Sequence, residues 1–156
     1  MKNKREVIYW MLLISWMIGI FFMSNQPASI SDSQSFGVIK VLSNIGINMN
    51  GIFGELANFV VRKCSHFFEY MILALLIFNV SKLYFNMKQV TIITILFVFI
   101  YACSDEIHQL FVLGREGAIR DVIIDTCGGI VLVLIKLYVS HLKRSALQNK
   151  DLEKLK

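Results

Sequence analysis

The chain has 156 residues, a length typical of one domain, and 56% of them are hydrophobic whereas only 17% are charged. Soluble domains carry about a quarter charged residues, so this composition excludes an ordinary soluble protein and indicates an integral membrane protein. The formal net charge of +5 does not indicate a nucleic-acid partner, because the lysines and arginines gather in short segments beside apolar runs.

Residues 7–23 are predicted to form the first membrane span. This segment is nearly all apolar and follows the basic residues Lys2, Lys4 and Arg5. It exceeds the roughly 7–15 residues of a signal-peptide core, and no A-x-A cleavage site follows it, so we expect no cleaved signal peptide. Pro27 and its polar neighbours end the helix.

The segment after Pro27 is predicted to lie on the membrane surface. Its apolar residues recur at helical spacing beside polar ones, which is typical of an amphipathic helix rather than a span; they are Phe36, Ile39, Leu42 and Ile45. A second helical segment is expected over residues 52–61, with Asn50 as its N-cap.

Three further spans are predicted, at about residues 64–81, 90–112 and 121–140. A polar connection separates the first two, and a tight turn with two glycines separates the last two. We therefore expect an all-α integral membrane fold, a four-helix transmembrane bundle formed by a membrane domain of residues 1–142. Residues 143–156 form a basic tail that we place in the cytoplasm.

The distribution of basic residues predicts the orientation. With both termini in the cytoplasm, the opposite side carries only Lys40, Arg62, Lys63, Arg115 and Arg120. The cytoplasmic segments carry the larger set, which is Lys2, Lys4, Arg5, Lys82, Lys88, Lys143, Arg144, Lys150, Lys154 and Lys156. This bias satisfies the positive-inside rule and makes the amphipathic helix between spans one and two extracellular.

Acidic and imidazole side chains occur inside three spans, all near one end. At about 1.5 Å per residue, Glu69, Asp105 and Asp125 fall at the same depth, because successive spans run antiparallel. Ionisable residues inside spans mark functional sites, so we expect a shared polar pocket there. Gly128, on the same stripe of its helix as Asp125, would let a neighbouring backbone approach closely.

Five residues of this region are candidate catalytic groups: His66, Glu69, Asp105, Glu106 and His108. Adjacent carboxylates compete to hold a proton, which suits general acid or base chemistry, although His66 and Glu69 could pair only to satisfy one another. Asp105 and His108 also have the i, i+3 offset of bundle metal ligands. Carboxylate pairing with lysine or arginine would absorb the same charges. We therefore expect no metal or other cofactor, with a divalent ion as the alternative.

A second group consists of candidate ligand-binding residues: Lys63, Tyr70, Gln109, Arg115, Arg120, Asp121 and Asp125. Arginine forks bind phosphate and carboxylate groups bidentately, so Arg115 and Arg120 at the turn suit an anionic headgroup. The alternative is that these two arginines only anchor the turn at the membrane interface.

These motifs resemble those of the VanZ family of small bacterial membrane proteins. The resemblance rests on Arg62-Lys63-x-x-His66-Phe-x-Glu69-Tyr70 and Asp105-Glu106-x-His108-Gln109-x-Phe111, followed by Gly114-Arg115, Arg120-Asp121 and Asp125-Thr-x-Gly128. Leu113 departs from the proline of many relatives. The resemblance implies a multi-pass protein of the bacterial cell membrane and, for the founding member, a role in resistance to the glycopeptide teicoplanin. It implies no particular reaction.

The predicted function is therefore binding of an anionic ligand in a pocket at the outer membrane face. The ligand would be a lipid-linked wall precursor, a phospholipid headgroup or a glycopeptide, and the protein could contribute to teicoplanin resistance. One alternative is an enzyme that cleaves or transfers a lipid headgroup, with His66 or His108 as base. Another is a small transporter with Glu69 and Asp125 as coupling carboxylates. A homo-oligomer is compatible with each hypothesis.

Overall fold

The computed structural model describes residues 4–154, and the side chains of residues 4–148. Its elements are α1 (Lys4–Ser24), α2 (Ala28–Asn44), α3 (Met49–Phe53), the 3₁₀ turn η1 (Gly54–Leu56), α4 (Ala57–Ser81), α5 (Met87–Gln109) and α6 (Ile119–Lys154). Within this described part the fold is all-helical. Four segments are long and apolar enough to cross a membrane, namely α1, α5, α6 and the stretch Met49–Ser81 that contains α4.

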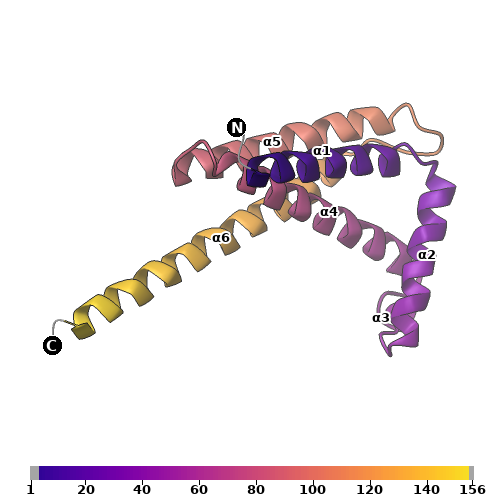
Figure 1. Ribbon diagram of the computed structural model, residues 1–156. Helices are drawn as coiled ribbons and strands as arrows, with labels where there is room; N and C mark the ends of the chain where they lie inside the picture. Colours follow the sequence, from indigo (N-terminus) through magenta and orange to yellow (C-terminus); the bar gives the residue numbers. More distant parts are fainter. Residues whose placement is uncertain (1–3, 155–156) are drawn as a thin grey trace.

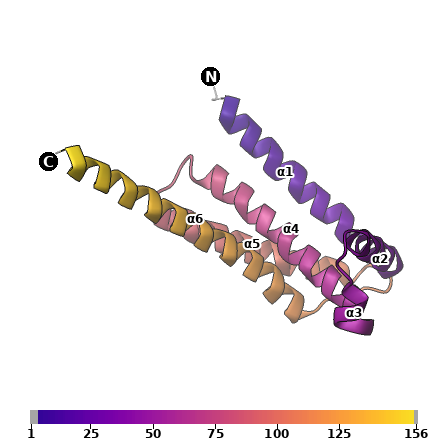
Figure 2. The ribbon, with the colours of Figure 1, turned by 90° about the horizontal axis from the view of Figure 1, so that it is seen from below.

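Helix α4 is the centre of the arrangement, because it packs against α1, α2, α5 and α6. Helix α2 lies across the ends of α1 and α4, and the C-terminal half of α6 projects beyond the other helices (Figures 1 and 2). The main core joins Tyr70 and Leu73 of α4 to Val98 and Ala102 of α5 and to Leu132 of α6. Many large apolar side chains point outward, as expected for a surface that hydrocarbon covers.

Glycines of α6 allow this close packing. A Cβ atom at Gly128 would lie only 2.3 Å from the backbone oxygen of Phe67 in α4. Gly129 faces α5, where the nearest atom to an added Cβ is Cγ1 of Val98 at 2.9 Å. The expectation that Gly128 permits close approach of a neighbouring backbone is confirmed.

The segment between α2 and α4 differs in detail from the sequence prediction. Asn48, not Asn50, caps the short helix α3, and its side chain accepts a hydrogen bond of 2.9 Å from the Gly51 amide. Helix α4 begins at Ala57, seven residues before the predicted span, because η1 continues directly into it. Lys63 and His66 therefore lie within a regular helix and project from adjacent turns of it.

The predicted amphipathic helix is present as α2, but its apolar stripe does not act as one surface. Ile39 is buried with Ala57 and Val61, and Leu42 packs against the same cluster. Phe36 and Ile45 are 59% and 68% exposed. Two of the four apolar residues thus attach α2 to α4, and the other two point away from the protein.

Candidate functional site

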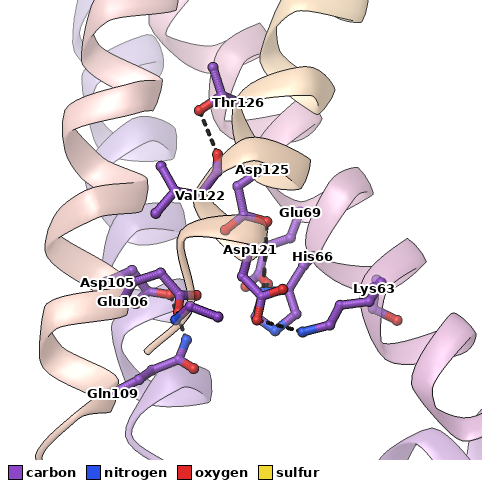
Figure 3. Close-up of polar contacts among 12 residues, drawn as sticks. Lys63, His66, Glu69, Asp105, Glu106, Gln109, Asp121, Val122, Asp125 and Thr126 are labelled. Carbon is purple, nitrogen blue, oxygen red and sulfur yellow. Dashed lines mark hydrogen bonds and ion pairs between the residues drawn. The ribbon is translucent and has the colours of Figure 1, made fainter. Parts of the chain in front are cut away.

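The polar residues meet at the end of the bundle where α2 crosses it (Figures 1 and 3). Three helices supply the labelled side chains, which approach one another around the first turns of α6. They include Lys63, His66 and Glu69 from α4, Asp105, Glu106 and Gln109 from α5, and Asp121 and Asp125 from α6. The antiparallel order of these helices brings residues distant in the chain to one depth.

Lys63 and Asp121 form the closest ion pair of this region. The Lys63 Nζ atom lies 2.5 Å from Oδ2 of Asp121, and the two side chains are only 13% and 10% exposed. Arg120 adds a second, longer contact of 3.6 Å to Oδ1 of Asp121. This pair ties α4 to the first turn of α6 and neutralises much of the charge of both partners.

His66 lies between two carboxylates. Its Nδ1 atom is 4.0 Å from Oε2 of Glu69 and 4.0 Å from Oδ1 of Asp125, which suits charge attraction but exceeds a hydrogen bond. Asp125 is fully buried, and neither of its carboxylate oxygens has a hydrogen-bond partner among the described residues. The three side chains therefore form a compact group in which a small shift would let the imidazole donate to either carboxylate.

Asp105 and Glu106 face different surroundings, as neighbours on a helix must. Asp105 accepts a 3.0 Å hydrogen bond from Gln109 and lies beside Ser24 and the buried Tyr70. Glu106 accepts a 2.8 Å hydrogen bond from the Ala118 amide and so holds the turn that precedes α6. The geometry gives Glu106 a structural task, whereas Asp105 remains with the polar residues of α4.

His108 faces α1 rather than His66. Its Nε2 atom lies 3.2 Å from Oδ1 of Asn25, and its ring centroid lies 4.7 Å from that of Phe21. The two histidines that the sequence suggested for one site therefore have different neighbours: the Glu69 and Asp125 carboxylates lie near His66, whereas Asn25 and Phe21 lie near His108. Over the described residues, no group of three or more His, Cys, Asp or Glu side chains is placed to hold a metal ion.

The turn between α5 and α6 is docked onto the α1–α2 connection. Arg115 donates a 3.1 Å hydrogen bond to the backbone oxygen of Gln26, and the Ala28 amide donates to the Leu113 oxygen at 3.2 Å. Gly114 has φ +73°, a conformation that favours glycine. These contacts fix the turn and the position of Arg115.

Burial lowers the pKa of Arg115, and the nearby Arg62 guanidinium lowers it further. The carboxylates of Asp105, Asp32 and Glu106 act on its pKa in the opposite direction. An arginine remains protonated throughout the physiological range, so Arg115 is a half-buried cation among mixed charges.

Two adjoining pockets open at this site. The first has a volume of about 140 Å³ and is lined by the cationic side chains Arg62, Lys63, Arg115 and Arg120. The second, of about 150 Å³, is lined by Glu69 and Asp105 together with side chains of α1 and α2. We call them the cationic pocket and the mixed pocket. Arg62, His66 and Arg115 line both, so these three side chains form the boundary between them.

The structure adds residues that the sequence reasoning missed. Asp32 of α2 pairs with Arg62 at 2.9 Å and also accepts a hydrogen bond from Asn58 at 3.2 Å. Ser31 and Ser35 of α2 are buried and line the mixed pocket. Their i, i+4 spacing was a usable signal, since it places two hydroxyl groups on one helical face.

The family model described as VanZ/LLP1 matches residues 9–140, most of the chain. The chain belongs to the VanZ/LLP1 family. No curated protein matches it, and no solved structure does. Family membership and the four candidate spans together make it a multi-pass membrane protein of the cell envelope. The family match thus confirms the resemblance that the motifs of α4, α5 and α6 suggested, whereas the site residues rest on the geometry above.

Proposed function

We propose that this VanZ/LLP1-family protein binds an anionic ligand in the cationic pocket, at the outer face of the membrane. The observation that carries the proposal is the convergence of Arg62, Lys63, Arg115 and Arg120 on one pocket. Only two acidic residues line it, Glu116 and Asp121, so positive charge is in excess. The volume far exceeds the roughly 10–15 Å³ that one water molecule requires, and it accommodates a phosphate or carboxylate group.

The chemistry of the pocket favours phosphate or carboxylate over neutral ligands. Arg120 is exposed, stacks at 4.9 Å over the Phe59 ring, and presents a guanidinium fork at the pocket wall. A lipid-linked wall precursor, a phospholipid headgroup and a lipophilic glycopeptide all supply such anions. We propose that the protein contributes to teicoplanin resistance by binding such a ligand in the cationic pocket.

Ligand binding is expected to depend on the pocket arginines. The probe is phosphatidylglycerol, titrated into the full-length protein in phosphatidylcholine nanodiscs and followed by native mass spectrometry. Arg120→Gln should weaken binding about tenfold, because a hydrogen bond to a charged group contributes about 1.5–3 kcal/mol. Lys40→Gln is the control, since Lys40 is exposed on α2 outside the pocket and should bind as the wild type does. Equal binding by all three proteins would refute the anion site.

The outer location is tested by topology mapping. The positive-inside rule places both termini in the cytoplasm and the pocket outside. Alkaline phosphatase fused after Gly46 should be active, whereas fusions after Phe85 and at the C-terminus should be inactive. The opposite activity pattern would place the pocket at the cytoplasmic face and would refute the outer location while leaving the pocket itself unchanged.

Teicoplanin susceptibility tests the cellular part of the proposal. A Gram-positive host that expresses the wild type should tolerate more teicoplanin than a host with the empty vector. Arg120→Gln, Asp105→Asn and His66→Ala variants at equal membrane levels should lose the protection. Protection by all of these variants would show that the pocket does not act in resistance, and absence of protection by the wild type would remove this function from the protein.

A second candidate, an enzyme acting on a lipid headgroup, is favoured by the surroundings of His66. This imidazole borders both pockets and lies 4.0 Å from each of two carboxylates, an arrangement that suits a general base beside a bound anion. Release of a headgroup or phosphate by the purified protein, abolished by His66→Ala, would establish catalysis. Saturable binding without release would favour the binding function.

A further inference from the structure

The mixed pocket differs in chemistry from the cationic pocket beside it. Glu69 and Asp105 line it, and carboxylates accept hydrogen bonds but donate none when ionised. Two serines also make part of the pocket wall polar: Ser24, whose hydroxyl group lies near Asp105, and Ser31. A ligand group that bears hydroxyl or ammonium donors is therefore the natural partner of this pocket.

The mixed pocket also has an apolar edge formed by Ile20 and Met23 of α1 and Val38 of α2. Met23 is 50% exposed and Val38 is 44% exposed, so this edge reaches the outer surface of the helices. Exposed apolar residues of α2 extend that surface, including Val41 at 61% and Ile45 at 68%. The pocket is thus continuous with surface that lipid chains would cover.

Helix α2 contributes hydroxyl groups to the mixed pocket. Two of its serines, Ser31 and Ser35, are buried toward the pocket, and Ile39 on the same stripe is buried against α4. The inward side of α2 therefore carries both hydroxyl and apolar groups. Its exposed side also carries both kinds, and the apolar side chains there, Ile30 and Val41 among them, are available to acyl chains.

The boundary residues connect the two spaces. Since Arg62, His66 and Arg115 line both pockets, a phosphate held between the two guanidinium groups would reach both sides of this boundary. The ion pair of Arg62 with Asp32 is partly exposed, with side chains 26% and 41% accessible, so a ligand phosphate competes with it at little cost.

The geometry points to one bipartite site, formed by both pockets, for a phosphodiester lipid whose headgroup carries hydroxyl or ammonium donors. The phosphate contacts Arg62 and Arg115, the donors contact Glu69 and Asp105, and the acyl chains leave over Met23 and Val38. This inference rests on the proposed function, because it assumes that the cations bind the phosphate. It adds to that function the class of lipid headgroup that is bound and the path that the acyl chains take.

The first test measures the headgroup selectivity of lipid binding. The protein is placed in nanodiscs of a neutral glycolipid, and the probe lipids have identical acyl chains and different headgroups. Phosphatidylglycerol and phosphatidylethanolamine should bind about tenfold more tightly than phosphatidylcholine, which has no donor in its headgroup. Asp105→Asn should reduce this preference about tenfold, since the amide loses the charge that an ammonium or hydroxyl group contacts. Glu55→Gln, at an exposed acid outside both pockets, should preserve it.

The path of the acyl chains is tested by a matched pair of valine-to-tryptophan substitutions. Val38→Trp fills the apolar edge of the mixed pocket and should weaken phosphatidylglycerol binding about tenfold, a loss of about 1.4 kcal/mol. Val139→Trp, at an exposed position of α6 outside both pockets, should not. Glycerol phosphate, which has the headgroup but no chains, should bind both variants equally and distinguishes a lipid site from a free-phosphate site.

The outcomes separate the two proposals. Suppose that Arg120→Gln weakens binding, whereas the three lipids bind equally well and Asp105→Asn and Val38→Trp behave as the wild type. The bipartite site is then wrong and the anion site stands. If glycerol phosphate binds as tightly as the lipid, the site recognises the free anion and the chain path is wrong. If no anionic probe binds the wild type, both proposals fail together.

Discussion

Replacing Gly128 with alanine is expected to destabilise the protein by about 1–3 kcal/mol, the usual cost of overpacking a tight core. The new Cβ would lie 2.3 Å from the Phe67 oxygen, 3.2 Å from the Phe67 carbonyl carbon and 3.3 Å from the Met71 nitrogen. All three are backbone atoms, so no side-chain rotation relieves the overlap. Helices α4 and α6 would have to separate, which weakens the most extensive helix contact of the fold.

Two other glycines provide the controls, with thermal unfolding in detergent as the measurement. Gly19→Ala should be neutral or stabilising by up to about 1 kcal/mol, because nothing lies within 4 Å and alanine favours the helix. Gly129→Ala should fall between the two, since the nearest atom belongs to the Val98 side chain. If Gly128→Ala unfolded at the same temperature as Gly19→Ala, the close crossing of α4 and α6 would be wrong.

Removing one partner of the Lys63–Asp121 pair should cost about 3–5 kcal/mol, because an uncompensated charge remains in a nearly buried position. Lys63→Met should fall toward the lower end of this range, as Arg120 already lies 3.6 Å from Asp121. Asp121→Leu leaves the lysine 5.3 Å from the Phe59 ring without its carboxylate. The free energy of unfolding in detergent measures each loss.

The double variant Lys63→Met/Asp121→Leu should recover much of that stability, because two apolar side chains replace a desolvated pair. Arg62→Met is the comparison one residue away. It breaks the more exposed pair with Asp32 and should cost only about 0–1 kcal/mol. A double variant no more stable than the single ones would mean that the two side chains do not interact as the structure places them.

Several features of the site followed from sequence spacing, whereas others depended on how the helices face one another. The rise per residue and the antiparallel order placed Glu69, Asp105 and Asp125 at one depth, and the structure brings them to one end of the bundle. Sequence spacing did not distinguish the tasks of Asp105 and Glu106. Only the packed turn shows that Glu106 binds the Ala118 amide.

The site residues that the sequence did not predict belong to α2, because the role of this helix depends on tertiary contacts. Asp32 sits in a serine-rich segment, and nothing in that segment predicts a pair with Arg62, 30 residues later. His108 shows the same dependence, since its spacing from Asp105 suggested a shared site, whereas its ring also lies against Phe21 of α1, at a centroid distance of 4.7 Å. In both cases the partner belongs to a helix whose rotation the local sequence does not fix.

The sequence by itself determined the class of protein, the apolar segments, the polar residues within them and the family, because these follow from composition, periodicity and motif. It also predicted the close approach at Gly128, since a glycine on a polar stripe has few other uses in a span. Only the tertiary structure decided which charges pair, which carboxylate faces the pocket and that α2 turns Ser31 and Ser35 inward. The physical reason is that the depth of a residue in the membrane follows from its position along its own helix. The direction in which its side chain points depends on packing among several helices.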